Sequence, residues 1–437
     1  MPDGDAGKVQ EVCPPQELPL TDRRYIGLMV MCALVGVVAG LLVTVFFSIV
    51  TPGINFLWTD LPEQLGVGEA PSIYYYTIGM CLVGGLIVGL IVKYTKEPAT
   101  ILAEEMDEVA SEMRMAPRKG IVNMVRGMVA LIFGGAVGPE GPLVAGSGAV
   151  GTWLGERQKL PKTGVMAYTF SSLCGVMGTF FGSPFAMPIL TIEGSLEKGK
   201  MSWRLLLPGI IAATTGYAVF YYFTKYVFGG EYIFPPYEGL ALVHLLYAVL
   251  LGAIGAGVGL LFIYTYQGMR RASAPFKKYP LTLGLVGGLV LGVIGSFIPL
   301  VMFSGEHQIQ EVIDDAAEMG VLVLLFLALL KIFLSNVCIS TGWAGGYIFP
   351  LLFSGLAMGM AVSLLLPFIP AAVCMVCVMG GAFVAVLKSP IAVAMITAVL
   401  FSTSLVPVTA VAVVTAVVLT FSIPLIPNDV EGGKAGS

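Results

Sequence analysis

Gly138-Pro139-Glu140-Gly141-Pro142 separates two apolar segments of the chain, 121–137 and 143–154. Its prolines lack an N–H group and favour a break in one helix followed by the start of another. A glutamate at membrane depth costs roughly 3 kcal/mol on insertion scales, so it needs hydrogen-bond donors nearby. The free N–H groups of a helix start are such donors, for the Glu140 carboxylate or for an anion. The stretch therefore predicts a broken helix facing an anion path; the alternative is a surface loop with Glu140 in water.

The composition around this stretch is that of a protein that crosses a membrane many times. The chain has 437 residues, of which 57% are apolar and 11% are charged, whereas soluble domains carry about 25% charged residues. Its 55 glycines and 27 prolines suit helices that pack closely and are often interrupted. We therefore expect an all-α polytopic membrane protein.

The distribution of Lys and Arg predicts the orientation in the membrane. Arg23 and Arg24 precede the first apolar span, at 25–50, and the following loop at 51–72 has acids but no Lys or Arg. Positive charges favour the cytoplasmic side, so Arg23 and Arg24 place the N-terminus in the cytoplasm. We also expect a cytoplasmic C-terminus and a location in the plasma (inner) membrane. The predicted divisions are a cytoplasmic segment at 1–24, a single transmembrane domain at 25–427 with repeat halves at roughly 73–227 and 240–425, and a polar tail at 428–437.

The repeat halves are predicted from two similar pieces of sequence. Ser183-Pro184 and Ser389-Pro390 both precede an apolar residue and an alanine. They follow Pro142 and Pro350, which end two Gly-rich breaks, by intervals of 42 and 40 residues. The alternative interpretation is coincidence in a Gly-rich membrane protein. Paired broken helices are a feature of transporters and channels rather than of enzymes.

The remaining polar residues do not indicate an enzyme or a metal site. His244 and His307 lie far apart in the sequence, and the chain has no nucleophile–base motif and no P-loop. Cys374 and Cys377 form a C-x-x-C without a second pair, so core packing explains them better than zinc. The dense acids of 98–114 favour a short cytoplasmic or re-entrant helix with a solvated face over a calcium site. We predict no cofactor, no metal and no nucleic-acid partner.

Together these motifs resemble the CLC family of chloride channels and proton/chloride antiporters. The first break is similar to the family's Gly-Arg-Glu-Gly-Pro motif, and Gly345-Gly346-Tyr347-Ile348-Phe349-Pro350 is similar to its Gly-x-Phe-x-Pro region. The resemblance runs from Arg23 to about Pro427, and it is to prokaryotic-type members without cytoplasmic regulatory domains. It implies an inverted two-fold repeat with broken and re-entrant helices, and a homodimer in which each subunit has its own pore.

The resemblance also implies roles for single residues. Glu140 would be the gating glutamate, whose carboxylate occupies an outer anion site and leaves when it is protonated or displaced. Backbone N–H groups around Gly141 would line that site, and those of Tyr347 and Ile348 would line a central one. Thr95 would stand for a serine of the family that contacts the anion.

Several positions depart from the family pattern. Pro139 replaces an arginine near the outer mouth, and Ile426 stands where the family has a central tyrosine. Glu193 matches the first acid of a Glu-Glu pair, but Gly194 falls at the second, proton-carrying acid. Glu193 either takes over that role or has a structural one at a helix or subunit end, and the structural role is favoured. These departures leave the identity of the anion and the coupling to protons open.

The leading hypothesis is transport of a small inorganic anion, with chloride as the first candidate, by a membrane-embedded CLC-type transporter that can exchange it for protons. One alternative is a passive voltage- or pH-gated anion channel of the same type. Another is a cation-coupled carrier of a different family, in which Glu140 and Glu193 bind Na⁺. An intramembrane enzyme would need a nucleophile–base pair or a metal cluster in the spans, and the sequence offers neither.

Overall fold

The computed structural model describes residues 23–196, 203–226, 232–237, 239–401 and 403–426, and their regular structure is helical apart from one isolated bridge. The rest of the predicted N-terminal segment and the polar tail lie outside the described residues. The α-helices are α1 (Arg23–Asn55), α2 (Leu61–Leu65), α3 (Ser72–Thr95), α4 (Leu102–Glu112), α5 (Pro117–Ile132), α6 (Glu140–Arg157), α7 (Lys162–Phe181), α8 (Ala186–Leu196), α9 (Leu206–Thr224), α10 (Leu242–Ser273), α11 (Pro280–Phe297), α12 (Gln308–Asp314), α13 (Ala316–Ser340), α14 (Ile348–Leu365), α15 (Ala371–Leu387), α16 (Pro390–Leu400) and α17 (Val406–Thr420).

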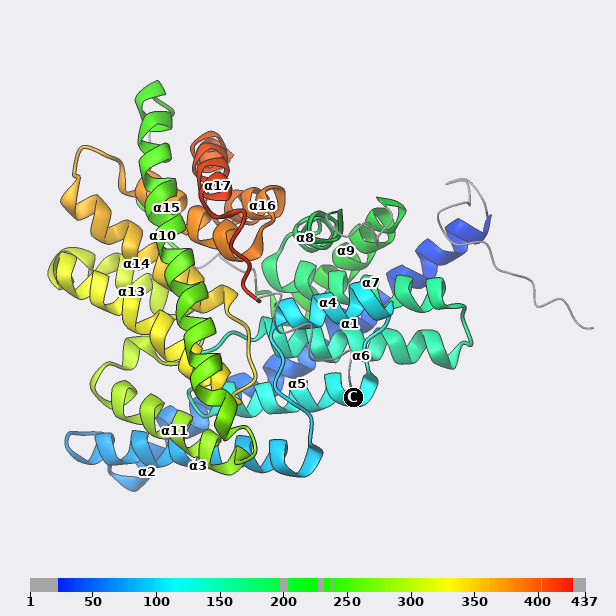
Figure 1. Ribbon diagram of the computed structural model, residues 1–437, viewed down its shortest axis with the longest axis horizontal. Helices are drawn as coiled ribbons and strands as arrows, with labels where there is room; N and C mark the ends of the chain where they lie inside the picture. Colours follow the sequence, from blue (N-terminus) through cyan, green and yellow to red (C-terminus); the bar gives the residue numbers. More distant parts are fainter. Residues whose placement is uncertain (1–22, 197–202, 227–231, 238, 402, 427–437) are drawn as a thin grey trace, which may run out of the picture.

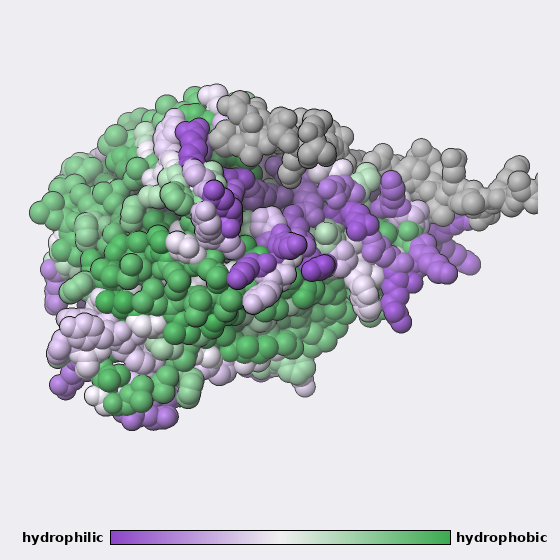
Figure 2. Space-filling model, turned by 60° about the horizontal axis from the view of Figure 1, so that its bottom comes forward, coloured by the Kyte–Doolittle hydropathy of each residue, from purple (hydrophilic) through white to green (hydrophobic). Residues whose placement is uncertain are grey.

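The helices are those of a membrane protein. In the described ranges, nine helical segments are long and apolar enough to cross a membrane. The most apolar window of α7 is 94% buried by other helices, against 33% for that of α3, so α7 lies in the interior and α3 at the periphery. Figure 2 shows a broad hydrophobic surface, with hydrophilic residues gathered mostly toward one edge. The prediction of an all-α polytopic membrane protein is confirmed.

The two halves of the chain repeat the same packing (Figure 1). In the first half α1 packs on α7 and α9, and in the second half α10 packs on α15 and α17. Likewise, α5 lies against α6 as α13 lies against α14. Helices α3 and α11 pack on each other so closely that a Cβ on Gly85 or Gly284 would overlap the other's carbonyl oxygen. This agrees with a two-fold repeat, and the correspondence includes α1, which precedes the predicted first half at 73–227.

Two helix ends differ from the predicted spans. The apolar segment 121–137 does not stay helical to its end, because α5 stops at Ile132 and Gly134 has a left-handed φ of 85° that glycine adopts readily. The second break ends earlier than expected, since α14 begins at Ile348. The early end of α5 lengthens the non-helical backbone before α6. The early start of α14 places the beginning of that helix inside the Gly-rich motif.

The cysteine pair of α15 lies in the core. Cys374 and Cys377 are fully buried, form no disulfide and belong to the main hydrophobic cluster. The core-packing interpretation of this C-x-x-C is confirmed.

Candidate functional site

The two Gly-rich breaks meet inside the molecule. Gly138 and Gly346 form an isolated antiparallel bridge, in which the N–H of each donates to the carbonyl oxygen of the other at 2.8 and 2.7 Å. Two residues after each glycine a helix begins, α6 at Glu140 and α14 at Ile348. The bridge therefore joins two helix N-termini, one from each half, and N–H groups at a helix start lack intrahelical partners.

Glu140 lies at this meeting point with 0% of its surface exposed. Its Oε1 accepts a 2.5 Å hydrogen bond from the N–H of Ile348, the first residue of α14. Its Oε2 has no hydrogen-bond partner among the described residues. The alternative of a surface loop with Glu140 in water is therefore wrong. A helix N-terminus stabilises a carboxylate and would equally attract a small free anion.

Glycine is needed around this carboxylate because the packing leaves no room for a side chain. A Cβ on Gly138 or on Gly346 would overlap the carboxylate of Glu140. A Cβ on Gly141 would lie 2.9 Å from the carbonyl carbon of Gly345 and 3.0 Å from the nitrogen of Gly346. The glycines of both breaks thus let a carboxylate and two backbone segments approach one another.

The other predicted ligands at the two helix starts lie in the same place. Gly141 is buried in the first turn of α6, and Tyr347 and Ile348 are 2% and 1% exposed. The Tyr347 ring packs against Phe262 of α10, with 5.6 Å between the ring centroids. Because the N–H of Ile348 already binds the Glu140 carboxylate, an anion could take that N–H only in place of the carboxylate.

Thr95 is engaged within its own turn. It is the last residue of α3, and its hydroxyl donates to the carbonyl oxygen of Ile91 at 2.6 Å. The Thr95 hydroxyl oxygen also accepts a long 3.4 Å hydrogen bond from the N–H of Glu97. In the part of the chain that the structure describes, it makes no hydrogen bond to α6 or α14. Within the described residues, Thr95 therefore makes no hydrogen bond to the group around Glu140.

Glu193 lies on α8 and contacts the start of α16. Its Oε1 accepts from the N–H of Ile391 and its Oε2 from the N–H of Ala392, both at 2.9 Å. Both donors belong to the first turn of α16, so the carboxylate caps that helix from a neighbouring one. Gly194, the next residue, carries no side chain that could act as an acid.

Ile426, at the place of the family's tyrosine, is partly buried against the hydrophobic core. The carbonyl oxygens of Pro424 and Leu425 accept hydrogen bonds from the Gln267 side chain at 3.0 and 3.3 Å. The backbone here is therefore fixed to α10, but the position supplies no hydroxyl.

Two buried cations were not predicted as buried. Lys331 of α13 is 0% exposed, and its Nζ donates to three carbonyl oxygens of the segment 301–303 at 3.1, 2.9 and 2.8 Å. Arg126 of α5 is also 0% exposed, and its Nη2 donates to the carbonyl oxygen of Glu97 at 2.8 Å. In the sequence, each of these residues is the single basic residue of an apolar segment. Such a residue in a membrane protein indicates a functional position.

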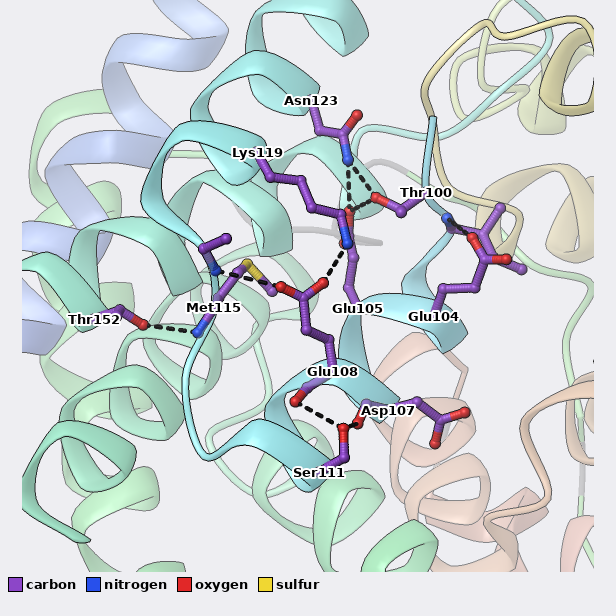
Figure 3. Close-up of polar contacts among 12 residues, drawn as sticks. Thr100, Glu104, Glu105, Asp107, Glu108, Ser111, Met115, Lys119, Asn123 and Thr152 are labelled. Atoms are coloured by element: carbon purple, nitrogen blue, oxygen red, sulfur yellow. Dashed lines mark hydrogen bonds and ion pairs between the residues drawn. The ribbon is translucent and has the colours of Figure 1, made fainter. Parts of the chain in front are cut away.

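The acidic helix α4 is less solvated than predicted (Figure 3). Glu105 is 2% exposed, and its Oε1 accepts hydrogen bonds from the Thr100 hydroxyl at 2.8 Å and from the Asn123 amide at 3.5 Å. Glu108 forms an ion pair with Lys119 of α5. The expectation of a solvated acidic face is therefore wrong for Glu105. Its burial raises the pKa of its carboxyl group well above the ordinary value.

Comparisons with known proteins agree with this architecture. The model of the voltage gated chloride channel family matches residues 84–420. The chain is 25% identical over 402 residues to "Putative ion-transport protein YfeO" of Escherichia coli (strain K12 / DH10B), which covers 90% of this chain and 92% of the relative. The protein of that name from Shigella flexneri is 26% identical over 403 residues, with the same coverage of both chains.

Solved structures share the fold. A CLC-type fluoride/proton antiporter superposes with a TM-score of 0.75 at 20% identity, covering 92% of this chain and 97% of that one. A slow cyanobacterial Cl⁻/H⁺ antiporter gives 0.78 at 16% identity, covering 91% and 96%. A eukaryotic CLC transporter gives 0.72 at 17% identity, covering 92% and 73%. Because the sequence identities are low, these superpositions show only that the helices are arranged in the same way.

Proposed function

The chain belongs to the CLC family of voltage-gated chloride channels, and on this premise we propose that it moves a small inorganic anion across the membrane with Glu140 as the gate. The observation that carries the proposal is the contact of the Glu140 carboxylate with the N–H of Ile348. At this helix start the Glu140 carboxylate occupies a position that would also suit a free, transported anion. Protonation or displacement of the carboxylate frees that N–H for the substrate.

Chloride is the first anion to test and fluoride the second. Two structural relatives are antiporters of these two anions, in each case with protons as the exchanged ion. Gly141, Tyr347 and Ile348 contribute backbone N–H groups, which stabilise an anion through partial charges and so permit release. Thr95 and Ile426 supply no free hydroxyl to select for one anion, so the side chains there support neither over the other.

Exchange for protons is the first candidate mechanism and passive conduction is the second. Glu140 is a titratable group on the path and supports exchange. Passive conduction is favoured by the geometry of Glu193, because both of its oxygens are held by α16 and Gly194 lacks an acid. A homodimer with one pore in each subunit, in the plasma membrane with cytoplasmic termini, completes the proposal and is supported by the family resemblance.

Anion efflux from proteoliposomes, with a pH electrode in the same chamber, tests the proposal. Vesicles are loaded with chloride, fluoride or nitrate, and efflux is followed with and without a K⁺ shunt. Efflux that drives proton uptake at zero imposed voltage, and that Glu140→Ala uncouples, is expected of an exchanger. Efflux that needs only the shunt and moves no protons identifies a passive conductor. Absence of efflux for every anion would overturn the proposed function.

A further inference from the structure

Arg126 is a buried cation whose hydrogen bonds are only partly made. Its side chain is 0% exposed, and Nη2 donates to the Glu97 carbonyl oxygen at 2.8 Å. Its Nε and Nη1 are also buried and have no hydrogen-bond partner within the described residues. No carboxylate of these residues forms an ion pair with the guanidinium. A buried charge without a paired counter-charge is strongly unfavourable, so the two unpartnered nitrogens of this guanidinium suit an anionic ligand.

The segment around Arg126 borders both helix breaks. The next residue, Gly127, packs so closely on Pro142 that a Cβ there would overlap the proline ring. The same Cβ would lie 3.4 Å from the carbonyl oxygen of Ala344 in the second break. On its other side Arg126 contacts Glu97, in the loop between α3 and α4. Arg126 therefore contacts that loop directly, and its neighbour Gly127 contacts the place where α6 and α14 begin.

Neighbouring polar groups do not supply the missing charge. Asn123, one turn before Arg126 on the same face of α5, is neutral and donates to the Thr100 hydroxyl (Figure 3). Glu105 is the buried carboxyl group of this region, but the nearby cation that acts on it is Lys119. The acidic residue that acts on Arg126 is Glu97, whose carbonyl oxygen, rather than its carboxylate, makes the contact.

The anion ligands expected elsewhere leave this role open. The Thr95 hydroxyl is turned to the Ile91 carbonyl oxygen, and Pro139 has no charge where the family carries an arginine. We infer that Arg126 holds the transported small monovalent anion at a second point, on the side of Glu140 that faces the α3–α4 loop. The inference rests on the proposed transport function and adds a fixed positive charge to a path otherwise lined by backbone N–H groups. Charge-assisted hydrogen bonds from a guanidinium bind halides and oxyanions alike.

Isothermal titration calorimetry of the full-length protein in detergent, with chloride, fluoride and nitrate as separate titrants, tests the inference. Arg126→Gln removes the charge, and Arg126→Lys keeps it on a different donor group. Arg114→Gln is the matched control, because Arg114 is exposed and pairs with Glu156 at 2.7 Å. We expect Arg126→Gln to raise the Kd of the preferred anion about tenfold or more. Arg126→Lys should raise it less, and Arg114→Gln should leave it unchanged.

A folded Arg126→Gln protein with unaltered anion affinity would overturn the inference, and so would an equal loss in Arg114→Gln. If Arg126→Gln does not fold, anomalous diffraction from crystals of the wild-type protein grown in bromide tests the inference instead. Anomalous density in contact with the guanidinium supports the site, and density only at other places refutes it. The proposed function fails separately: a wild-type protein that binds anions through Arg126 but moves none in proteoliposomes keeps the site and loses the transport.

Discussion

Glu140 and Glu193 make the same kind of contact in two different surroundings. Each comes from a helix of the first half and accepts hydrogen bonds from the first turn of a helix of the second half. Glu193 is partly exposed and uses both oxygens, whereas Glu140 is 0% exposed and leaves Oε2 without a partner among the described residues. A buried, half-paired carboxylate is held at a cost that a fully paired one avoids.

A helix start alone does not distinguish a gate from a cap. Both carboxylates benefit from the same N–H groups and the same helix dipole. They differ in solvation and in how many carboxylate oxygens the partner helix holds. Glu140 uses only Oε1 toward α14, whereas Glu193 uses both oxygens toward α16. We therefore assign the movable carboxylate to Glu140 and the structural one to Glu193.

The largest effect is expected from neutralising Glu140. Glu140→Gln keeps an oxygen that can accept from Ile348 but no longer titrates, and Glu140→Ala removes the side chain from the path. Both variants should lose the pH dependence of anion flux and retain the flux itself. The measurement is the rate of efflux from proteoliposomes over a series of pH values. Glu63→Gln, at an exposed acid of α2, is the control. Unchanged pH dependence in both Glu140 variants would show that Glu140 is not the gate.

The next largest effect should be a loss of stability when the cap on α16 is removed. Glu193→Ala deletes two hydrogen bonds to a charged group, which we expect to lower the free energy of unfolding by about 2 kcal/mol. Glu193→Gln keeps one acceptor and should cost less. Thermal unfolding in detergent measures the change, and anion flux per folded molecule should stay close to that of the wild type. Selective loss of proton movement would show instead that Glu193 carries protons.

The sequence predicts one side of this comparison better than the other. Glu140 stands between two prolines and two glycines, so its break and its place at a helix start follow from local chemistry. The partners of Glu193 are Ile391 and Ala392, about 200 residues away, and only the packing of α8 on α16 brings them together. The first break could be located from the sequence, but the donors to each carboxylate could not.

The buried charges show the same limit. Arg126 continues a polar stripe of α5 with Lys119 and Asn123, but periodicity does not reveal whether this stripe faces water or another helix. Glu105 stands among other acids, which predicted a solvated face, yet α4 turns this one residue toward Asn123 and Thr100. In both cases the neighbouring elements, rather than the local sequence, determine the environment of the charge.

Glu105 extends the comparison to a buried carboxyl group that accepts hydrogen bonds from side chains rather than from the N–H groups of another helix start. Burial raises its pKa in the folded state. Its contribution to stability is therefore fully present below the unfolded pKa and is lost as the pH rises through the folded pKa. Glu105→Gln stays neutral, so its melting temperature should exceed that of the wild type at neutral and alkaline pH, with the difference shrinking toward acid pH. Glu112→Gln, at an exposed acid of the same helix, is the control. A difference that does not change with pH would contradict this account.

The smallest effect is expected from Tyr347→Phe, which tests whether backbone or side chain binds the anion beside Glu140. The variant keeps the backbone N–H and the ring that packs on Phe262, and it removes only the hydroxyl. Losing one hydrogen bond of about 1 kcal/mol would weaken anion binding roughly fivefold. If only N–H groups bind the anion, the Kd from calorimetry should stay within about twofold of the wild type. A larger loss would make the Tyr347 hydroxyl a ligand, and the path would then rely on side chains as well as on the two helix starts that Glu140 joins.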